Sequence, residues 1–541
     1  MNNSIFNVPL PINEPIYNYE PGSKERQEIE QELKHQSNTV VQIPLVINGK
    51  KIYDGKKGQI FMPHNHKHKL AEFTIAGKEE LQQAVESSIK AKERWYALPW
   101  AQRAGIFLKA ADLIAGPYRQ RMNAATMLGQ SKTIHQAEID SACEIADFLR
   151  FNVYYAQEIF KIQPENAPQI WNRLEHRPLS GFVLCISPFN FTAIGGNLPT
   201  APAIMGNTAV WKPSSTAVLS NYIFYEILEE AGLPDGVINF VPSSGEDISQ
   251  YVLTDKRMAG FHFTGSTEVF SNVWQKIGEN IKTYENYPRL VGETGGKDFI
   301  FAHPTSEVVP LVTALVRGSY EYQGQKCSAA SRAYIPKSIW PHVKDLMLAE
   351  VSKIKVGDVS DFKNFMGAVI DKKSYDNIVS YIKYADQSPE AEVLCGSYDD
   401  SQGYFVKPTV IETTNPKFKS MVEEIFGPVL TVYVYPDGEF ETALESCKTA
   451  SPYALTGAIF AKDRNALAYM EKYLGDAAGN FYLNDKPTGA VVGQQPFGGG
   501  RASGTNDKAG SILNMLRWSS PRTIKETFVS PVKVEYPFMA D

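Results

Sequence analysis

The chain has 541 residues, of which 43% are apolar and 11% aromatic, values typical of a globular enzyme with more than one domain. Its 54 basic and 60 acidic residues give a net charge of −6 without long blocks of one sign, so there is no basic footprint for nucleic acid. No apolar run reaches the ~18 residues of a transmembrane helix, and the N-terminus has the pattern of neither a signal nor a transit peptide.

The N-terminal segment contains several prolines before Gly22, which is consistent with an extended arm on the protein surface or, equally, with a free tail. Ser23 is placed to cap a helix that runs to about Lys34. Residues 43–53 predict a hairpin with a turn at Asn48-Gly49. The next elements predicted are helices at about 78–95, 100–115 and 134–157 and a rather polar strand at 170–179.

From residue 181 the pattern changes to short, nearly continuous apolar runs, separated by segments long enough to hold a helix. Such runs are typical of buried parallel strands joined by crossovers. The first set comprises 181–187, 208–212, 237–241 and 258–263, and the second comprises 298–302, 332–335, 429–434, 457–460 and 479–483. We therefore predict two α/β domains, followed by a strand at 523–529 that is donated to a partner subunit.

Five cysteines are widely spaced and form neither a CxxC pair nor a Cys/His cluster, so we expect no disulfide framework, no metal site and a cytoplasmic location. A cysteine is ordinarily a small core residue. Cys327 differs because Gly324, Lys326 and Ser328 make a poor core environment, and a nearby cation favours the reactive thiolate. Glu293, in Val291-Gly-Glu-Thr-Gly-Gly-Lys297, offers a carboxylate base. A thiol with such a base indicates a covalent thioester route.

A nucleotide site is suggested by the turn Thr264-Gly-Ser-Thr-Glu268, which joins a predicted strand to a helix. Free N–H groups at a helix N-terminus suit a phosphate, although ordinary helix capping explains the same residues. Lys212 ends another strand and adds a cation, which could equally be a solvated surface charge.

Seven stretches together resemble the aldehyde dehydrogenase superfamily and follow one another in the family's order. They are Pro188-Phe-Asn-Phe191, Trp211-Lys-Pro-Ser214, Phe263-Thr-Gly-Ser-Thr-Glu268, Glu293-Thr-Gly-Gly-Lys297, Gly324-Gln-Lys-Cys327, Glu423-Glu-Ile-Phe-Gly-Pro428 and Pro496-Phe-Gly-Gly499. Gly324-Gln-Lys-Cys-Ser-Ala-Ala-Ser-Arg332 and Thr488-Gly-Ala-Val-Val-Gly-Gln-Gln-Pro-Phe497 are most similar to the 1-pyrroline-5-carboxylate dehydrogenase subfamily.

The resemblance implies an α/β fold of two Rossmann-like domains with a small β oligomerisation flap, in a homo-oligomer built from dimers. The implied boundaries are an N-terminal arm at 1–42, an NAD-binding domain at 43–166 and 186–297, a catalytic domain at 298–506, and the flap with its C-terminal strand at 167–185 and 507–541.

In the resemblance, Cys327 attacks the aldehyde, Asn190 stabilises the oxyanion, and Glu293 activates water. The implied NAD-binding residues are Ser187, Phe189, Lys212, Ser214, Ser215, Gly265, Ser266, Glu424 and Phe426. Phe189 stands where many members carry Trp. Ser215 stands where many NAD-preferring members carry Glu, which weakens the choice of NAD over NADP; we expect NAD because the closest subfamily uses it.

The resemblance places a substrate carboxylate against Ser328, Gly489 and Ala490, its aliphatic stem between Phe191 and Phe497, and its ammonium at Glu144. The implied reaction oxidises L-glutamate γ-semialdehyde to L-glutamate, the second step of proline catabolism, with a separate proline dehydrogenase as an upstream partner. Another semialdehyde, such as succinate semialdehyde, and a non-catalytic relative are the alternatives.

Overall fold

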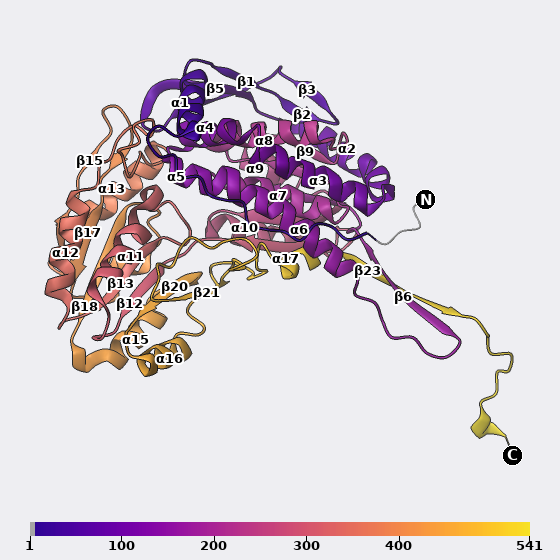
Figure 1. The fold of residues 1–541 in the computed structure, drawn as a ribbon. Coiled ribbons are helices and arrows are strands. Elements are labelled where there is room, and N and C mark those ends of the chain that lie inside the picture. Colours follow the sequence, from indigo (N-terminus) through magenta and orange to yellow (C-terminus); the bar gives the residue numbers. More distant parts are fainter. Residues whose placement is uncertain (1–5, 541) are drawn as a thin grey trace.

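The computed structural model describes residues 6–540. It consists of two α/β lobes side by side, with a two-stranded arm that projects from one of them toward the C-terminus (Figure 1). None of the helices described between residues 6 and 540 combines the length and the apolar character needed to cross a membrane.

The first lobe is built on a seven-stranded sheet in the order β11-β10-β7-β8-β9-β2-β3. Its strands are β2 (Leu45–Ile47), β3 (Lys50–Ile52), β7 (Phe182–Ile186), β8 (Ala209–Lys212), β9 (Ile238–Phe240), β10 (Met258–Thr264) and β11 (Arg289–Glu293). The five strands from β11 to β9 are parallel. The strand order reverses between β7 and β10, and ligands bind at the carboxyl ends of strands beside such a reversal.

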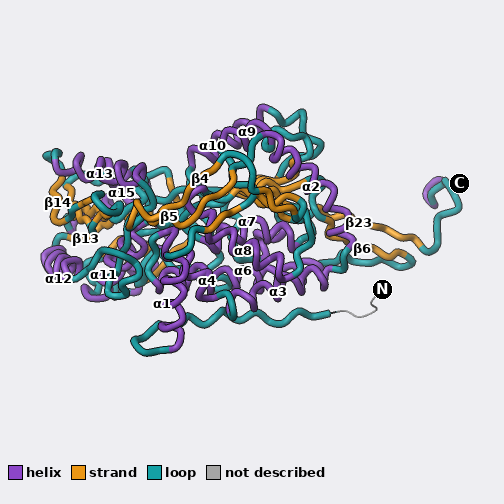
Figure 2. Tube along the Cα trace, turned by 90° about the horizontal axis from the view of Figure 1, so that it is seen from above, coloured by secondary structure: helices purple, strands orange, loops and turns teal. Residues whose placement is uncertain are grey.

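Apolar helices cover both faces of this sheet, with α2, α9 and α10 on one face and α3, α4, α6, α7 and α8 on the other (Figure 2). Their bounds are α2 (Lys78–Ala97), α3 (Trp100–Ala115), α4 (Arg119–Gln130), α6 (Ile145–Phe160), α7 (Thr192–Ile204), α8 (Val218–Ala231), α9 (Gly245–Tyr251) and α10 (Thr267–Glu279). The predicted helices at 78–95 and 100–115 and the hairpin at 43–53 are confirmed. The sequence did not indicate α4 or β11.

The helix predicted at 134–157 is interrupted. It comprises α5 (Ile134–Ala137), a π-helical turn (Glu138–Glu144) and then α6. A π turn inserts a residue into the α-helical register, and such turns are frequent at functional sites. Side chains before and after the turn therefore point in directions that a regular apolar period does not predict.

The second lobe contains a seven-stranded sheet in the order β14-β17-β18-β13-β12-β20-β21, parallel except for the edge strand β14. Its strands are β12 (Asp298–Ala302), β13 (Ala330–Pro336), β14 (Ala391–Cys395), β17 (Thr409–Thr413), β18 (Val429–Tyr435), β20 (Thr456–Phe460) and β21 (Asn480–Leu483). All five predicted strands of this lobe are confirmed. Helices α11 (Val308–Tyr320) and α12 (Trp340–Ser352) cover one face, and α13 (Lys372–Asp386), α15 (Phe440–Thr449) and α16 (Arg464–Tyr473) cover the other.

The N-terminal segment from residue 6 to 22 runs in an extended form along the first lobe (Figure 2) and leads into α1 (Lys24–Ser37), which Ser23 caps as predicted. Its Glu14 pairs with Arg119 and Arg150, at 2.7 Å each. The described part of this segment is therefore an ordered surface arm, whereas residues 1–5 lie outside the described chain.

The projecting arm consists of β6 (Ile170–Arg177) and β23 (Ser520–Thr527), paired antiparallel within the same chain. One predicted boundary needs correction. The flap range 167–185 includes most of β7, which lies inside the first sheet because its side chains are apolar and buried. The C-terminal strand β23 pairs with β6 of its own chain along one edge, and its donation to a partner subunit stays a prediction.

Candidate active site

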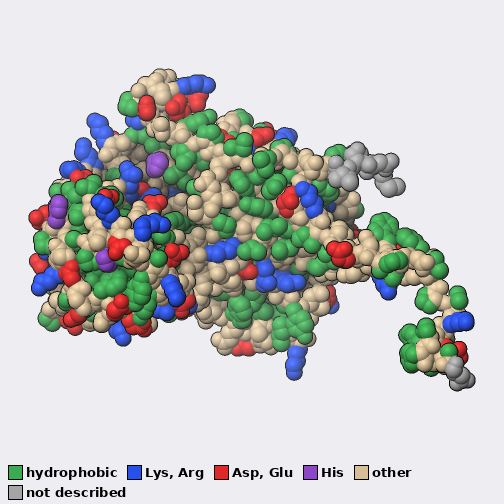
Figure 3. Space-filling view, turned by 60° about the horizontal axis from the view of Figure 1, so that its bottom comes forward, with side chains coloured by type: hydrophobic (Ala, Val, Ile, Leu, Met, Phe, Trp, Pro, Cys, Tyr) green, Lys and Arg blue, Asp and Glu red, His purple; other side chains and the backbone are tan. Residues whose placement is uncertain are grey.

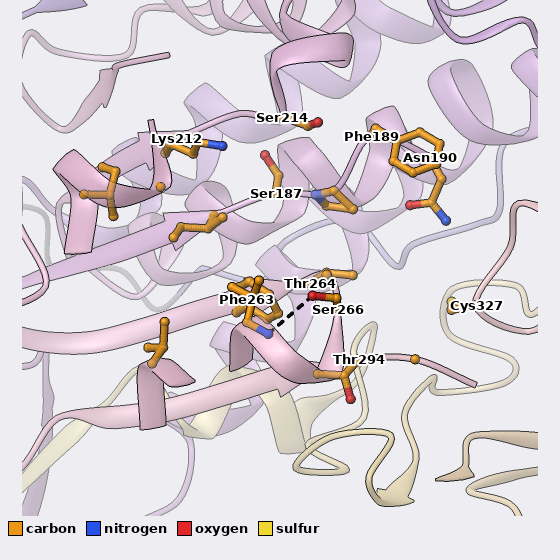
Figure 4. A pocket seen from close by; sticks show the side chains of 18 of the residues that line it. Ser187, Phe189, Asn190, Lys212, Ser214, Phe263, Thr264, Ser266, Thr294 and Cys327 are labelled. Atoms are coloured by element: carbon orange, nitrogen blue, oxygen red, sulfur yellow. Dashed lines mark hydrogen bonds between the residues drawn. The ribbon is translucent and has the colours of Figure 1, made fainter. Parts of the chain in front are cut away.

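Two cavities meet at Cys327, which lines both. The larger, of about 580 Å³, lies at the carboxyl ends of β7, β8 and β10 in the first lobe and reaches the second lobe at residues 424–426 (Figure 4). The smaller, of about 110 Å³, approaches the same thiol between the 486–497 segment and the π turn. A molecule bound in either cavity therefore reaches the sulfur.

The larger cavity brings together eight of the nine residues predicted to bind NAD. They are Ser187, Phe189, Lys212, Ser214, Gly265, Ser266, Glu424 and Phe426. The ninth, Ser215, is exposed at the start of a short 3-10 helix and does not line the cavity, so its contact with the cofactor stays a prediction. The turn after β8 carries the Ser215 side chain outward to solvent, and strand-end spacing alone did not indicate this.

The walls of the larger cavity suit a dinucleotide. Ser266 caps α10 by accepting a hydrogen bond from the Val269 N–H at 3.3 Å (Figure 4), so the helix N-terminus faces the cavity with its favourable dipole. The Lys212 ammonium lies on the opposite wall; no hydrogen bond joins it to a described residue, and burial lowers its pKa. A buried cation without a partner is costly unless a ligand supplies oxygen atoms. Ribose and phosphate oxygens would meet that need.

Glu424 and Phe426 close the end of this cavity nearest the thiol. The Gly296 N–H donates to the Glu424 carboxylate at 2.8 Å. Burial raises the pKa of Glu424 to about 7, against the opposing effect of this hydrogen bond and of Lys297. The rings of Phe426 and Phe189 meet edge to face at 5.8 Å. A planar group bound here would contact two aromatic rings and a carboxylate that can accept hydrogen bonds from hydroxyl groups.

The Cys327 loop is held in an unusual backbone conformation. Tyr322 and Gln323 have φ of 52° and 55°, and Gly324 has φ of 65°. A Cβ on Gly324 would lie 2.3 Å from the Gly427 carbonyl oxygen, so only glycine fits. The buried Gln323 amide stabilises this backbone by donating to the carbonyls of Ser131, at 2.9 Å, and Ala368, at 2.7 Å.

The thiol is not activated by its sequence neighbour. Lys326 donates to the Glu321 carboxylate at 3.1 Å, so its ammonium is committed to that partner and the predicted stabilisation of the thiolate is not supported. Burial raises the pKa of the Cys327 thiol well above its ordinary value, and the charge of Glu293 adds to this. Asn190 donates one amide hydrogen to the Gln325 carbonyl at 3.0 Å. The Asn190 side chain is thus fixed against the loop, with a second amide hydrogen free to bind an oxyanion.

Glu293 ends β11 and lines the smaller cavity together with Cys327. Burial raises its pKa to about 8; the positive charge of Lys508 opposes the shift and Asp507 adds to it. The Glu293 carbonyl accepts the Gly265 N–H at 3.1 Å, which ties the base to the turn before Ser266. Only the ionised form of this carboxyl group can take up a proton from water, and its fraction grows as the pH rises from 7 to 9.

The smaller cavity is lined by all six residues predicted to bind substrate: Ser328, Gly489, Ala490, Phe191, Phe497 and Glu144. Ser328 and Thr488 are joined through their hydroxyls at 2.8 Å. Glu144 is the last residue of the π turn, and burial, followed by the charge of Asp140, raises its pKa to about 8. In the part of the chain that the structure describes, no group of His, Cys, Asp and Glu side chains is arranged to hold a metal ion.

Sequence reasoning missed the buried pair Lys132–Asp140, joined at 2.7 Å. Asp140 accepts the N–H groups of Thr192, at 3.0 Å, and Ala193, at 2.8 Å, and so caps α7 directly after Asn190. It also missed Lys486, which lines the smaller cavity. The only feature of the sequence that could have indicated Lys486 is its position two residues before Thr488, which begins the stretch resembling the family's substrate loop.

The comparisons with known proteins agree with this geometry. The family model described as the aldehyde dehydrogenase family matches residues 53–524. The delta-1-pyrroline-5-carboxylate dehydrogenase of Dictyostelium discoideum, named mitochondrial, is 54% identical, covering 99% of this chain and 97% of that protein. The enzyme of the same name from Agaricus bisporus is 50% identical, covering 98% of each chain. The crystal structure of the Mycobacterium tuberculosis delta-pyrroline-5-carboxylate dehydrogenase bound with NAD is 51% identical, with a TM-score of 0.97 over 100% of both chains. The predicted fold class is therefore confirmed, and the chain belongs to the aldehyde dehydrogenase family.

Proposed function

We propose that this chain catalyses the NAD-dependent oxidation of L-glutamate γ-semialdehyde, the open form of 1-pyrroline-5-carboxylate, to L-glutamate. The observation that carries this conclusion is the position of Cys327 at the meeting point of two cavities. One cavity has a helix N-terminus and an unpaired lysine suited to a dinucleotide, and the other has a carboxyl base beside an amino-acid-sized space. Relatives about 50% identical over nearly the whole chain are named for this substrate, and one is a structure with NAD.

The residues act in sequence on the aldehyde. Cys327 loses its proton and its sulfur bonds to the carbonyl carbon, while the amide of Asn190 and the backbone N–H of Cys327 donate to the new oxyanion. NAD, when bound, supplies the acceptor for the hydride that leaves this carbon. Glu293 then takes a proton from a water molecule, whose oxygen attacks the resulting thioester and breaks its carbon–sulfur bond. The Cys327 thiolate that leaves takes back a proton, which restores the thiol. Aldehyde, NAD⁺ and water thus give carboxylate, NADH and two protons.

The proposal is tested by adding 1-pyrroline-5-carboxylate and NAD to the purified chain and measuring NADH by absorbance and glutamate by mass spectrometry. We expect both products in equal amounts, no turnover by Cys327→Ser, and slower turnover with NADP. The same assay with succinate semialdehyde tests the alternative substrate. A higher kcat/KM for succinate semialdehyde than for 1-pyrroline-5-carboxylate would contradict the proposal.

We further infer a homo-oligomer based on dimers. The projecting β6–β23 arm and the chain after it carry exposed apolar side chains, among them Trp171, Phe528, Val534 and Phe538 (Figure 3), and exposed apolar surface of this kind supports association. Sedimentation of the purified chain would measure the subunit number. A separate proline dehydrogenase, as the source of the substrate, and a cytoplasmic location are also part of the proposal; subcellular fractionation would test the location.

A further inference from the structure

We propose that Lys486 is a specificity-determining residue that selects aldehydes bearing a carboxylate at the end remote from the aldehyde. This inference rests on the proposed function and refines it. Lys486 and Lys326 are the two lysines that line the smaller cavity, together with Ser328 and Gly489. Its ammonium is available to a substrate because its existing contact is weak.

The weakness of that contact follows from the geometry around Glu321. The Glu321 carboxylate already accepts a hydrogen bond from the buried Lys326 at 3.1 Å. The Lys486 ammonium lies 3.6 Å from the same carboxylate oxygen, beyond ordinary hydrogen-bond range. Its side chain is 24% exposed and donates no hydrogen bond to a residue of the described chain. Lys486 can therefore turn to a second anion without leaving Glu321 unpaired.

The position of the ammonium matches the expected carboxylate site. A Cβ built on Gly489 would lie 3.4 Å from the Lys486 nitrogen, so the ammonium sits directly above the Gly489 backbone. Gly489 has φ of 94°, and Ser328 and Thr488 supply hydroxyls to the same side of the cavity. An anion bound there would receive neutral donors from the backbone and hydroxyls, with the cation at its outer edge.

The charged side chains at this end of the cavity are two lysines and one glutamate, whereas Glu144 and Glu293, whose pKa values burial raises to about 8, are mostly protonated at pH 7. Lys326 and Lys486 contribute two cations, and Glu321 contributes one anion. His135 lines the same cavity, and burial lowers its pKa, so it is neutral at pH 7. A substrate carboxylate beside Gly489 would pair with the Lys486 ammonium.

The test compares Lys486→Met with Lys486→Arg on two substrates, glutamate γ-semialdehyde and the uncharged butanal. For Lys486→Met we expect kcat/KM on the carboxylate substrate to fall about tenfold or more, through KM, because a hydrogen bond to a charged group is lost. The kcat/KM on butanal should change less than twofold, which also shows that the variant is folded. Lys486→Arg should retain most of the wild-type value. Lys472→Met, at an exposed lysine on α16, controls for net charge.

Two outcomes would overturn the inference: an unchanged KM for the carboxylate substrate, or an equal loss on both substrates, which indicates a structural role. If the wild-type chain fails to oxidise glutamate γ-semialdehyde, the proposed function fails instead. The role of Lys486 is then decided by the same comparison with succinate semialdehyde against butanal.

Discussion

Glu293 should control the pH dependence of thioester hydrolysis. Its pKa of about 8 results from burial at the end of β11, opposed by the positive charge of Lys508. Only the ionised carboxylate can accept a proton from water, so the rate of deacylation should follow the ionised fraction of this group. Replacing Glu293 by Gln preserves the shape of the side chain and removes the titrating group.

The size of the effect follows from this pKa. With a pKa of about 8, about 9% of the carboxyl groups are ionised at pH 7 and about 91% at pH 9. Deacylation should therefore accelerate about tenfold between these pH values. Loss of the base should lower the rate by roughly 10²–10⁴-fold at pH 9.

Stopped-flow measurement of NADH separates the two halves of the reaction. A burst of one NADH per active site reports acylation, and the slower steady phase reports deacylation where hydrolysis limits turnover. In Glu293→Gln the burst should persist while the steady phase becomes slow and independent of pH. Mass spectrometry of the quenched variant should find the acyl group on Cys327.

If Glu293→Gln retained the tenfold rise between pH 7 and pH 9, another group would be the base and the assignment of Glu293 would fail. It would also be refuted if the variant lost the burst, because Glu293 would then act before acylation. Lys508→Met provides a second check. Removal of this opposing charge should move the midpoint of the wild-type profile to higher pH, because the ionised carboxylate loses a favourable neighbour.

Further consequences concern rate and stability. Asn190→Ala removes a hydrogen-bond donor to the oxyanion, so kcat in steady-state assays should fall by roughly 10²–10³-fold. Calorimetry should show little change in dinucleotide affinity. An unchanged kcat would exclude this role. Gly324→Ala should lower the unfolding free energy measured in urea by at least about 1 kcal/mol, because the new Cβ would meet the Gly427 carbonyl. A variant as stable and active as the wild type would argue against the constrained loop. Glu293 binds its proton more tightly in the folded protein, with a pKa of about 8 against 4.5, so folding stability falls as pH rises through this window. Because Gln does not titrate, the unfolding free energy of Glu293→Gln should rise relative to that of the wild type as the pH increases, by at most about 1.4 kcal/mol per pH unit. If the unfolding free energies of the two proteins depended equally on pH, the buried carboxyl group would be contradicted.

The pattern of apolar runs predicted the two α/β lobes, and the resemblance to the aldehyde dehydrogenase family implied most of the residues around the cofactor cavity. Buried parallel strands are apolar on both faces, so short apolar runs were enough to predict β7, β8 and β10 in the first lobe. In the second lobe they predicted β12, β13, β18, β20 and β21. Asn190, Lys212 and Ser266 follow the carboxyl ends of neighbouring strands, and parallel strands bring those ends to one edge of a sheet. Their places at strand ends indicated Lys212 and Ser266, whereas the role of Asn190 was implied by the resemblance to the family.

Which charged groups pair with one another depends on the folded chain. Lys326 lies next to Cys327 in the sequence but pairs with Glu321, and Glu144 reaches the smaller cavity through a π turn that the apolar period does not reveal. Burial raised the pKa of both Glu293 and the Cys327 thiol, where adjacent residues suggested a stabilised thiolate. Desolvation and ion pairing depend on atoms that the fold brings together from distant segments, and neither can be obtained from the order of residues alone.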